Sequence, residues 1–196
     1  MSKTIECFFD FGSPATYLAW TQLPALAARY HANLVWRPML LGAVFKATGN
    51  QSPAMNPAKG RYMLIDFQRY AQHYGVPMKF NPFFPINTMT LMRGAVALQD
   101  DARFDDYLDT VFKAIWVEEK NMGQPEVVAN VLEQAGFDAS ALLAACSDEM
   151  VKEKLKANTE EAVARGAFGA PTLYIDGEMF FGQDRLPMIE KALLAN

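Results

Sequence analysis

Ser13 stands where a strand-like segment passes into a helix, a position at which a hydroxyl could help to stabilise an anion. Apolar residues alternate before it with the period of a strand, and apolar residues recur at helical spacing after it. We therefore expect Ser13 at the helix N-cap and Pro14 at N1, where its missing N–H costs nothing. The unpaired N–H groups of the first turn and the helix dipole favour an anion there, such as a thiolate.

Capping alone would also explain Ser13, because Ser-Pro is an ordinary way to begin a helix. A second segment, far along the chain, favours the chemical interpretation. Residues 166–172 lead into two β-rich runs separated by Asp176-Gly177, a strong hairpin signal, and a final helix begins near residues 183–186 with Asp184 as its candidate N-cap. The pattern predicts a C-terminal ββα unit.

An N-terminal βαβ unit and a C-terminal ββα unit, with Pro171 entering the third strand, predict an α/β fold with a thioredoxin-like domain. Residues 1–40 and 166–196 would form that domain. Residues 41–165 would form a large all-helical insertion domain, with an irregular or partly helical beginning over 41–60 and a helix over 61–74.

Five short motifs, in order along nearly the whole chain, carry a resemblance to a known family. They are Asp10-Phe11-x-Ser13-Pro14-x-x-Tyr17-Leu18, Gly49-Asn50, Lys59-Gly60-x-Tyr62-Met63, Phe168-Gly169-x-Pro171-Thr172 and Phe181-Gly182-x-Asp184-Arg185. On a DsbA-like layout these motifs resemble the 2-hydroxychromene-2-carboxylate isomerases and the related kappa-class glutathione transferases. The positions of the thioredoxin Cys-x-x-Cys read Ser13-Pro14-Ala15-Thr16 here, so a redox dithiol is excluded at this place.

The resemblance implies a glutathione cofactor and a catalytic role for Ser13. A serine without a histidine or carboxylate partner in its motif is a poor nucleophile but a good hydrogen-bond donor, so thiolate stabilisation is expected rather than hydrolysis. The bound thiolate of an isomerase would add reversibly to an unsaturated aromatic pyruvate or its chromene form. In a kappa-class transferase, the alternative, it would attack an electrophile and leave as the conjugate. A DsbA-like, non-redox thiol-binding protein is the third and weakest reading.

The resemblance also assigns residues that bind glutathione. The main chain at Ala170, before a cis Pro171, would pair with the cysteinyl backbone. Gln183 and Asp184 would hold the γ-glutamyl end, although Asp184 could merely cap the last helix.

Two further residues match family positions across the cleft, namely Asn50 and Lys59. Lys59 would be a candidate partner of the glycyl carboxylate. Taken by itself, an exposed lysine is usually only solvated.

Composition sets outer limits on function. The 196 residues carry a net charge of −4 and form no basic run, which argues against nucleic acid as a partner. No apolar stretch approaches the length of a membrane span, and the first residues pass directly into a strand without a signal-peptide core, so a cytoplasmic location is expected. The resemblance to this family also implies a homodimer.

The remaining reactive side chains are sparse. Cys7 and Cys146 lie far apart in the sequence and are expected to be inert packing thiols, and His31 and His73 have no ligand-spaced neighbours, so no metal is predicted. Aromatic residues are abundant in the insertion, and each one by itself indicates core packing. Together they could line a pocket for a small aromatic substrate. These aromatic residues are Phe67, Tyr70, Phe80, Phe83, Phe84, Phe112 and Trp116.

Overall fold

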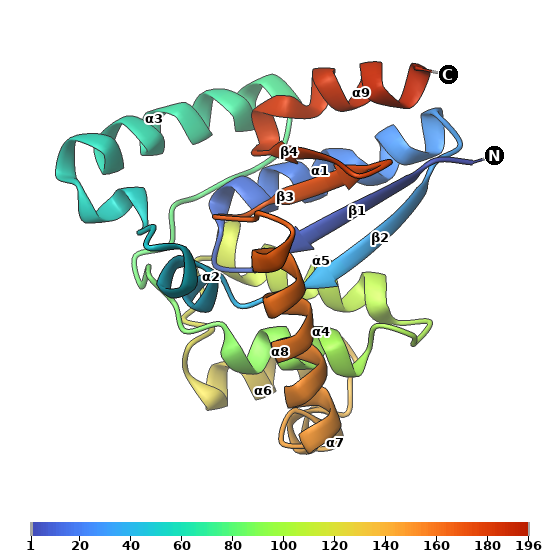
Figure 1. Ribbon diagram of the computed structural model, residues 1–196. Coiled ribbons are helices and arrows are strands. Elements are labelled where there is room, and N and C mark those ends of the chain that lie inside the picture. Colours follow the sequence, from blue (N-terminus) through green and yellow to red (C-terminus); the bar gives the residue numbers. More distant parts are fainter. Residues whose placement is uncertain (1, 196) are drawn as a thin grey trace.

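A mixed sheet with the strand order β2-β1-β3-β4 organises the chain (Figure 1), in a computed structural model that describes residues 2–195. β1 (Thr4–Phe9), α1 (Pro14–Arg29) and β2 (Asn33–Pro38) form the predicted βαβ unit. β1 and β2 are parallel, with Cys7 opposite Trp36. Ser13 is the N-cap of α1 and Pro14 follows at the first helical position, as the sequence predicted.

The C-terminal unit is the predicted hairpin followed by a helix. β3 (Thr172–Ile175) lies antiparallel to both β1 and β4 (Glu178–Phe181). Asp176 and Gly177 join β3 to β4 with φ values of 50° and 85°, the left-handed pair that an Asp-Gly hairpin turn requires. A short 3-10 helix, η2 (Gln183–Arg185), precedes α9 (Leu186–Leu194).

The prediction that Asp184 caps the last helix is wrong. The N-cap of α9 is Arg185, and no side chain caps that helix. Asp184 lies inside η2, and its carboxylate accepts a hydrogen bond from the Arg185 guanidinium at 2.6 Å. The extra 3-10 turn moves the start of α9 beyond the reach of Asp184.

Between β2 and β3 the chain, all of it described, contains helices and loops and no strand. These helices are α2 (Leu41–Thr48), η1 (Pro53–Met55), α3 (Pro57–Tyr74), α4 (Met89–Ala97), α5 (Phe104–Trp116), α6 (Pro125–Gln134), α7 (Ala139–Ala145) and α8 (Glu149–Ala164). α3 begins four residues before the predicted start, because Asn56 caps it by accepting from the N–H groups of Ala58 and Lys59. The expected helical insertion is thus present.

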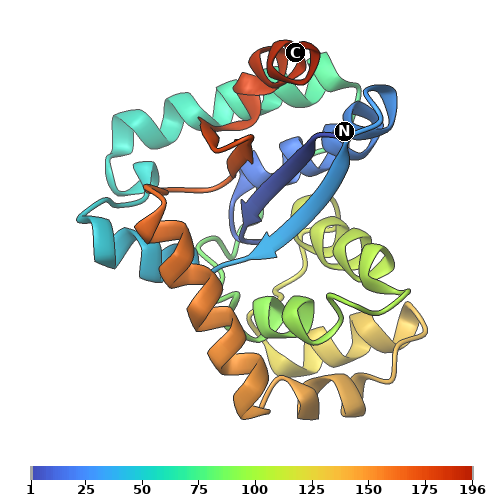
Figure 2. The same ribbon diagram turned by 45° about the vertical axis from the view of Figure 1, so that its right-hand side comes forward.

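The helices of the insertion divide between two sides of the sheet. In Figure 1, α3 and α9 lie at the top of the view, whereas α4, α6, α7 and α8 gather below the sheet; Figure 2 shows the same separation. α3 packs against α1, and α8 packs against α2, α4 and β2. The division into a domain of residues 1–40 with 166–196 and a domain of residues 41–165 remains a prediction.

An aromatic core joins the sheet to the insertion. Phe112 is fully buried and stacks on Trp20, and its ring centroid lies 4.7 Å from that of Phe11. Trp116 is also fully buried, and its indole N–H donates to the Phe11 carbonyl at 2.8 Å. Core packing therefore accounts for Phe112 and Trp116, and also for Phe67, whereas Phe83 is 51% exposed.

The two cysteines are buried packing thiols, as expected. Desolvation raises the pKa of Cys7, and it raises the pKa of Cys146 to about 11. Both thiols therefore stay protonated at neutral pH. In residues 2–195 no three potential ligands among His, Cys, Asp and Glu come together as a metal site, and none of the helices there has the length and apolar character of a bilayer span.

Candidate functional site

Ser13 lies at the centre of the site that the sequence predicted, between the start of α1 and the segment before β3. Its Oγ accepts a hydrogen bond from the Thr16 N–H at 3.1 Å, which is the expected N-cap interaction. The same Oγ donates to the Ala170 carbonyl at 2.9 Å. The Ser13 side chain and the Ala170 main chain therefore meet across 157 positions of sequence, and Ser13 is only 4% exposed.

The Ala170–Pro171 peptide bond is cis, as predicted from the resemblance. The main-chain carbonyls on both sides of Ala170 are each held by a donor within the protein. Gly169 accepts from the Thr172 hydroxyl at 2.9 Å, and Pro171 accepts from the Gly182 N–H at 3.1 Å. This segment is consequently held in one conformation before any ligand arrives.

Asn50 reaches the same segment from the loop after α2. Its side-chain amide donates to the Phe168 carbonyl at 2.8 Å, and its Oδ1 accepts from the Gln51 N–H at 2.8 Å. Asn50 itself is exposed. An amide group has two hydrogens, so one remains to serve a ligand.

Gln183 and Asp184 are connected to Pro171 through Gly182. Gln183 is buried, and its main-chain carbonyl accepts from the Tyr74 hydroxyl at 2.8 Å. The Asp184 carboxylate is about one-third exposed at 34% and forms an ion pair with Arg185. An incoming ammonium group would have to share this carboxylate with the guanidinium.

Lys59 stands apart from the other predicted residues. It lies in the first turn of α3, beside a small apolar hollow formed with Pro53, Tyr62 and Met63. Among residues 2–195 its ammonium group has no hydrogen-bond or ion-pair partner. The other predicted residues thus lie in, next to or in contact with the chain around the cis-proline, whereas Lys59 is an exposed cation at the start of α3.

Asp10 is a feature of the site that the sequence analysis did not single out. Its carboxylate is 3% exposed and accepts from the Gly12 N–H at 2.9 Å, the Leu41 N–H at 2.9 Å and the Thr88 hydroxyl at 2.7 Å. Desolvation raises the pKa of this carboxyl, although the three donors oppose that effect. Its place at the end of a strand, three residues before Ser13, was the available signal.

Phe168 and Phe181 form an aromatic pair beside the cis-proline segment. Their ring centroids are 4.5 Å apart, and each residue is 38% exposed. Gly169 lets the chain pass this pair, because a Cβ at that position would lie 2.7 Å from the Phe181 ring. These two exposed rings form an apolar surface beside the segment that carries Ala170, and neither of them is among the insertion aromatics that the sequence suggested.

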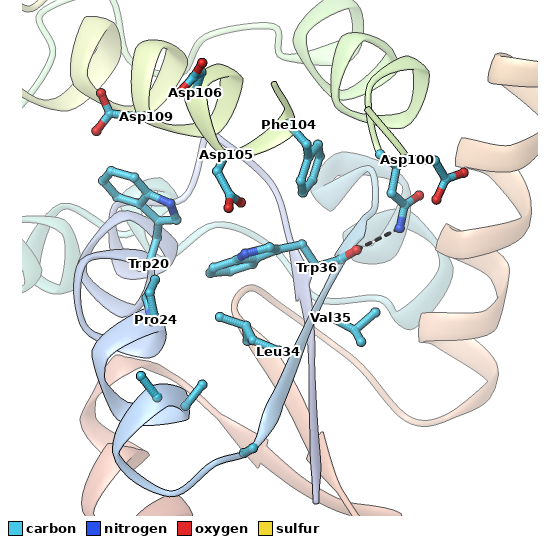
Figure 3. Close-up of a pocket in the computed structure, with 14 residues that line it drawn as sticks. Trp20, Pro24, Leu34, Val35, Trp36, Asp100, Phe104, Asp105, Asp106 and Asp109 are labelled. Carbon is cyan, nitrogen blue, oxygen red and sulfur yellow. Dashed lines mark hydrogen bonds between the residues drawn. The ribbon is translucent and has the colours of Figure 1, made fainter. Parts of the chain in front are cut away.

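A larger hollow of about 770 Å³ lies elsewhere, between α1, β2 and α5. Figure 3 shows Trp20 and Trp36 on its walls with Asp105 extending toward the space between them. None of the predicted site residues lines it. This hollow therefore does not belong to the Ser13 site.

Comparisons with known proteins cover nearly the whole chain. The family model of the DSBA-like thioredoxin domain matches residues 4–194. A 2-hydroxychromene-2-carboxylate isomerase of Pseudomonas putida is 33% identical over 96% of this chain and 93% of its own, and the glutathione S-transferase kappa 1 of Rattus norvegicus is 31% identical over 95% and 89%.

Solved structures give the same result. A 2-hydroxychromene-2-carboxylate isomerase superposes with a TM-score of 0.87 at 33% identity, covering 97% of this chain and 94% of the other. A probable DsbA oxidoreductase of Streptomyces coelicolor gives a TM-score of 0.75 at 18% identity, over 97% and 88%, which shows the shared fold alone.

Proposed function

The chain belongs to the DsbA-like thioredoxin-domain family that includes 2-hydroxychromene-2-carboxylate isomerases and kappa-class glutathione transferases, and from this premise we propose that it is a glutathione-dependent isomerase. Its substrate would be an aromatic hydroxychromene carboxylate or the related hydroxybenzylidene pyruvate. The observation that carries the proposal is the Ser13 hydroxyl, placed at the N-terminus of α1 against the main chain of the cis-proline segment.

The donor set around Ser13 fits glutathione. This tripeptide has a thiol, an ammonium group, two carboxylates and main-chain amides. Ser13 supplies a hydroxyl for the sulfur, Ala170 a main-chain carbonyl for strand-like pairing, and Asn50 a free amide hydrogen. Asp184 supplies a carboxylate for the ammonium group, Gln183 a buried amide beside it, and Lys59 an unpaired cation for a carboxylate.

Glutathione, when bound, would supply a thiolate that adds to a carbon–carbon double bond of the substrate and leaves again after rotation, without being consumed. The residues of this chain would hold and stabilise that sulfur. The Ser13 hydroxyl and the positive end of the α1 dipole favour its anionic form, and each unit by which the thiol pKa falls corresponds to about 1.4 kcal/mol. The exposed rings of Phe168 and Phe181 offer an apolar surface for an aromatic substrate beside it.

Conjugation of electrophiles, as in kappa-class transferases, is the second candidate function. The 31% identity to the rat enzyme over nearly the whole chain favours it. The same Ser13 geometry would serve both reactions, because both need a stabilised thiolate. They differ in whether the sulfur leaves the product.

An assay with 2-hydroxychromene-2-carboxylate, with and without glutathione, tests the proposal. We expect isomerisation that follows glutathione saturably while the total free thiol stays constant. Stoichiometric loss of free thiol, with an activated aryl halide as the electrophile, would favour the transferase. Absence of both activities, with no glutathione binding by calorimetry at millimolar concentration, would overturn both candidates.

The family resemblance also supports a homodimer. Large apolar side chains on α3 and α9 are exposed, including Tyr62 at 59%, Ile65 at 55% and Met188 at 52%. Both helices lie at the top of the views in Figures 1 and 2. Sedimentation equilibrium of the protein tests the dimer, and a monomer at micromolar concentration would contradict it.

A further inference from the structure

We propose that the Ser13 hydroxyl transfers its hydrogen bond from the Ala170 carbonyl to the ligand sulfur only when the ligand brings a main-chain N–H to that carbonyl. This inference rests on the proposed glutathione dependence. Under this proposal, Ser13 and Ala170 together distinguish the thiol of a cysteinyl peptide from a thiol that lacks a neighbouring main-chain N–H.

The first step of the argument is the number of hydrogens on Ser13. A hydroxyl has one proton to donate, and in this structure it is donated to Ala170. The oxygen of Ser13 is also engaged, because it accepts from the Thr16 N–H. Ser13 therefore has no second hydrogen for a sulfur anion, and it must release Ala170 before it can stabilise one.

The second step is the cost of that release. Ala170 is 8% exposed, and residues 2–195 provide no donor to its carbonyl besides Ser13. A buried carbonyl that loses its donor pays the full desolvation penalty of the group. A ligand N–H placed on this carbonyl, in the manner of an added strand, removes that penalty. A thiol without such an N–H does not.

The neighbouring carbonyls show why the effect is specific to Ala170. Phe168 accepts from Asn50, but the Asn50 amide keeps a second hydrogen for a ligand. Gly169 accepts from Thr172 and Pro171 from Gly182, and neither donor has to serve the sulfur. Only at Ala170 does the same hydrogen have two competing acceptors.

The test compares two ligands in two proteins. One ligand is glutathione, and the other is its depsipeptide analogue, in which an ester oxygen replaces the cysteinyl N–H. The ionisation of each bound thiol is followed by thiolate absorbance near 240 nm during a pH titration, in the wild type and in Ser13→Ala. We expect Ser13→Ala to raise the pKa of bound glutathione by about one unit, a tenfold lower thiolate fraction, and to leave that of the bound analogue unchanged.

An equal Ser13 effect on both ligands would overturn the inference and leave the proposed function intact. Failure of glutathione to bind, or a bound thiol pKa equal to that in solution, would overturn the proposed function as well. Asn50→Ala is the matched control, since its donor has a hydrogen to spare. It should weaken binding of both ligands by the same factor.

A second measurement covers the case in which the ester analogue does not bind. In a crystal structure of the glutathione complex, the Ser13 Oγ and the Ala170 oxygen should lie beyond hydrogen-bond distance, with the cysteinyl N–H directed at that oxygen. A complex in which Ser13 still donates to Ala170 would overturn the inference by itself.

Discussion

The Asp10 carboxylate and the Thr88 hydroxyl, 78 positions apart, lie within 2.7 Å of each other and connect the end of β1 to the start of α4. Thr88 is the N-cap residue of α4, and the Leu41 N–H that Asp10 also accepts belongs to the first residue of α2. One buried carboxylate thus holds two helices of the insertion against the segment that leads to Ser13.

We expect Asp10→Asn to destabilise the fold even though the two side chains have the same shape. The Asn amide nitrogen would face the Leu41 N–H, donor against donor, and one buried group left unpaired costs about 1 to 3 kcal/mol. Urea denaturation of both proteins measures the difference. Thr88→Val is the control, because it removes one hydrogen bond and creates no donor clash, so its smaller loss should be near 1 kcal/mol. Equal losses would contradict the argument.

Ser13→Ala should lose most glutathione-dependent activity while keeping the fold and much of the glutathione affinity. Removing one hydrogen bond to a charged sulfur costs about 1.5 to 3 kcal/mol, a drop of roughly 10- to 150-fold in rate if thiolate stabilisation limits turnover. Loss of the N-cap should lower the unfolding free energy by about 0.5 to 2 kcal/mol. The activity gap should narrow as pH rises, because alkaline solution ionises the thiol without help. Equal neutral-pH activity would make Ser13 only a helix cap.

Lys59→Ala should weaken glutathione binding and leave stability nearly unchanged. Lys59 is exposed and its ammonium has no partner among residues 2–195, so its removal breaks no hydrogen bond or ion pair of the side chain in the free protein. Loss of an exposed pair with a carboxylate costs about 0.2 to 1 kcal/mol, which corresponds to a dissociation constant up to about fivefold higher. Calorimetric titration measures the change. Lys154→Ala, an exposed lysine on α8, is the control and should leave the dissociation constant unaltered.

Glu6→Gln should reveal the pH dependence of the ion pairs that Glu6 forms with Arg37 and Arg165. Hydrogen bonds from Arg165 hold the pKa of Glu6 below its usual range, and the charges of Arg165 and Arg37 act in the same direction against the effect of burial. A lowered pKa in the folded state means that the stabilisation is complete above the unfolded value of about 4.3 and is lost as the pH falls through the lower folded value.

The variant should therefore be less stable by about 1 to 2 kcal/mol at pH 7, and this difference should shrink below about pH 4. Denaturation at several pH values measures it. Glu153→Gln, an exposed residue on α8, serves as the reference and should show no such trend. A constant Glu6→Gln difference across the acid range would contradict the ion-pair account.

Gly169→Ala should disturb the aromatic pair beside the site. The added Cβ would stand 2.7 Å from the Phe181 ring, so the ring or the segment must move, and such overpacking costs about 1 to 3 kcal/mol. Phe181→Leu in the same chain removes the ring atoms in conflict and should restore part of the stability. The double variant, measured by thermal unfolding beside both single variants, decides the point. Additive losses would show that the two positions do not interact.

Local patterns in the sequence predicted the elements that carry Ser13 and Pro171. Alternation and helical spacing locate β1 and α1, Ser-Pro marks the N-cap, and Asp176-Gly177 marks the hairpin, because each depends on residues close together in the chain. The relation of Ser13 to the cis-proline segment required the resemblance to known proteins. Local pattern failed at Asp184, where a 3-10 turn displaced the start of α9.

Only the tertiary structure decided which donors and acceptors pair in hydrogen bonds between distant parts of the chain. Ser13 donates to Ala170 and Asp10 accepts from Leu41 and Thr88 across long stretches of sequence, and no periodicity encodes such pairs. The burial of Phe112 likewise follows from how α5 packs on Phe9 of β1 and Trp20 of α1. The chemistry available to a residue can be inferred from its type and its sequence neighbours. The group that forms a hydrogen bond with its side chain is determined by the packing of distant elements.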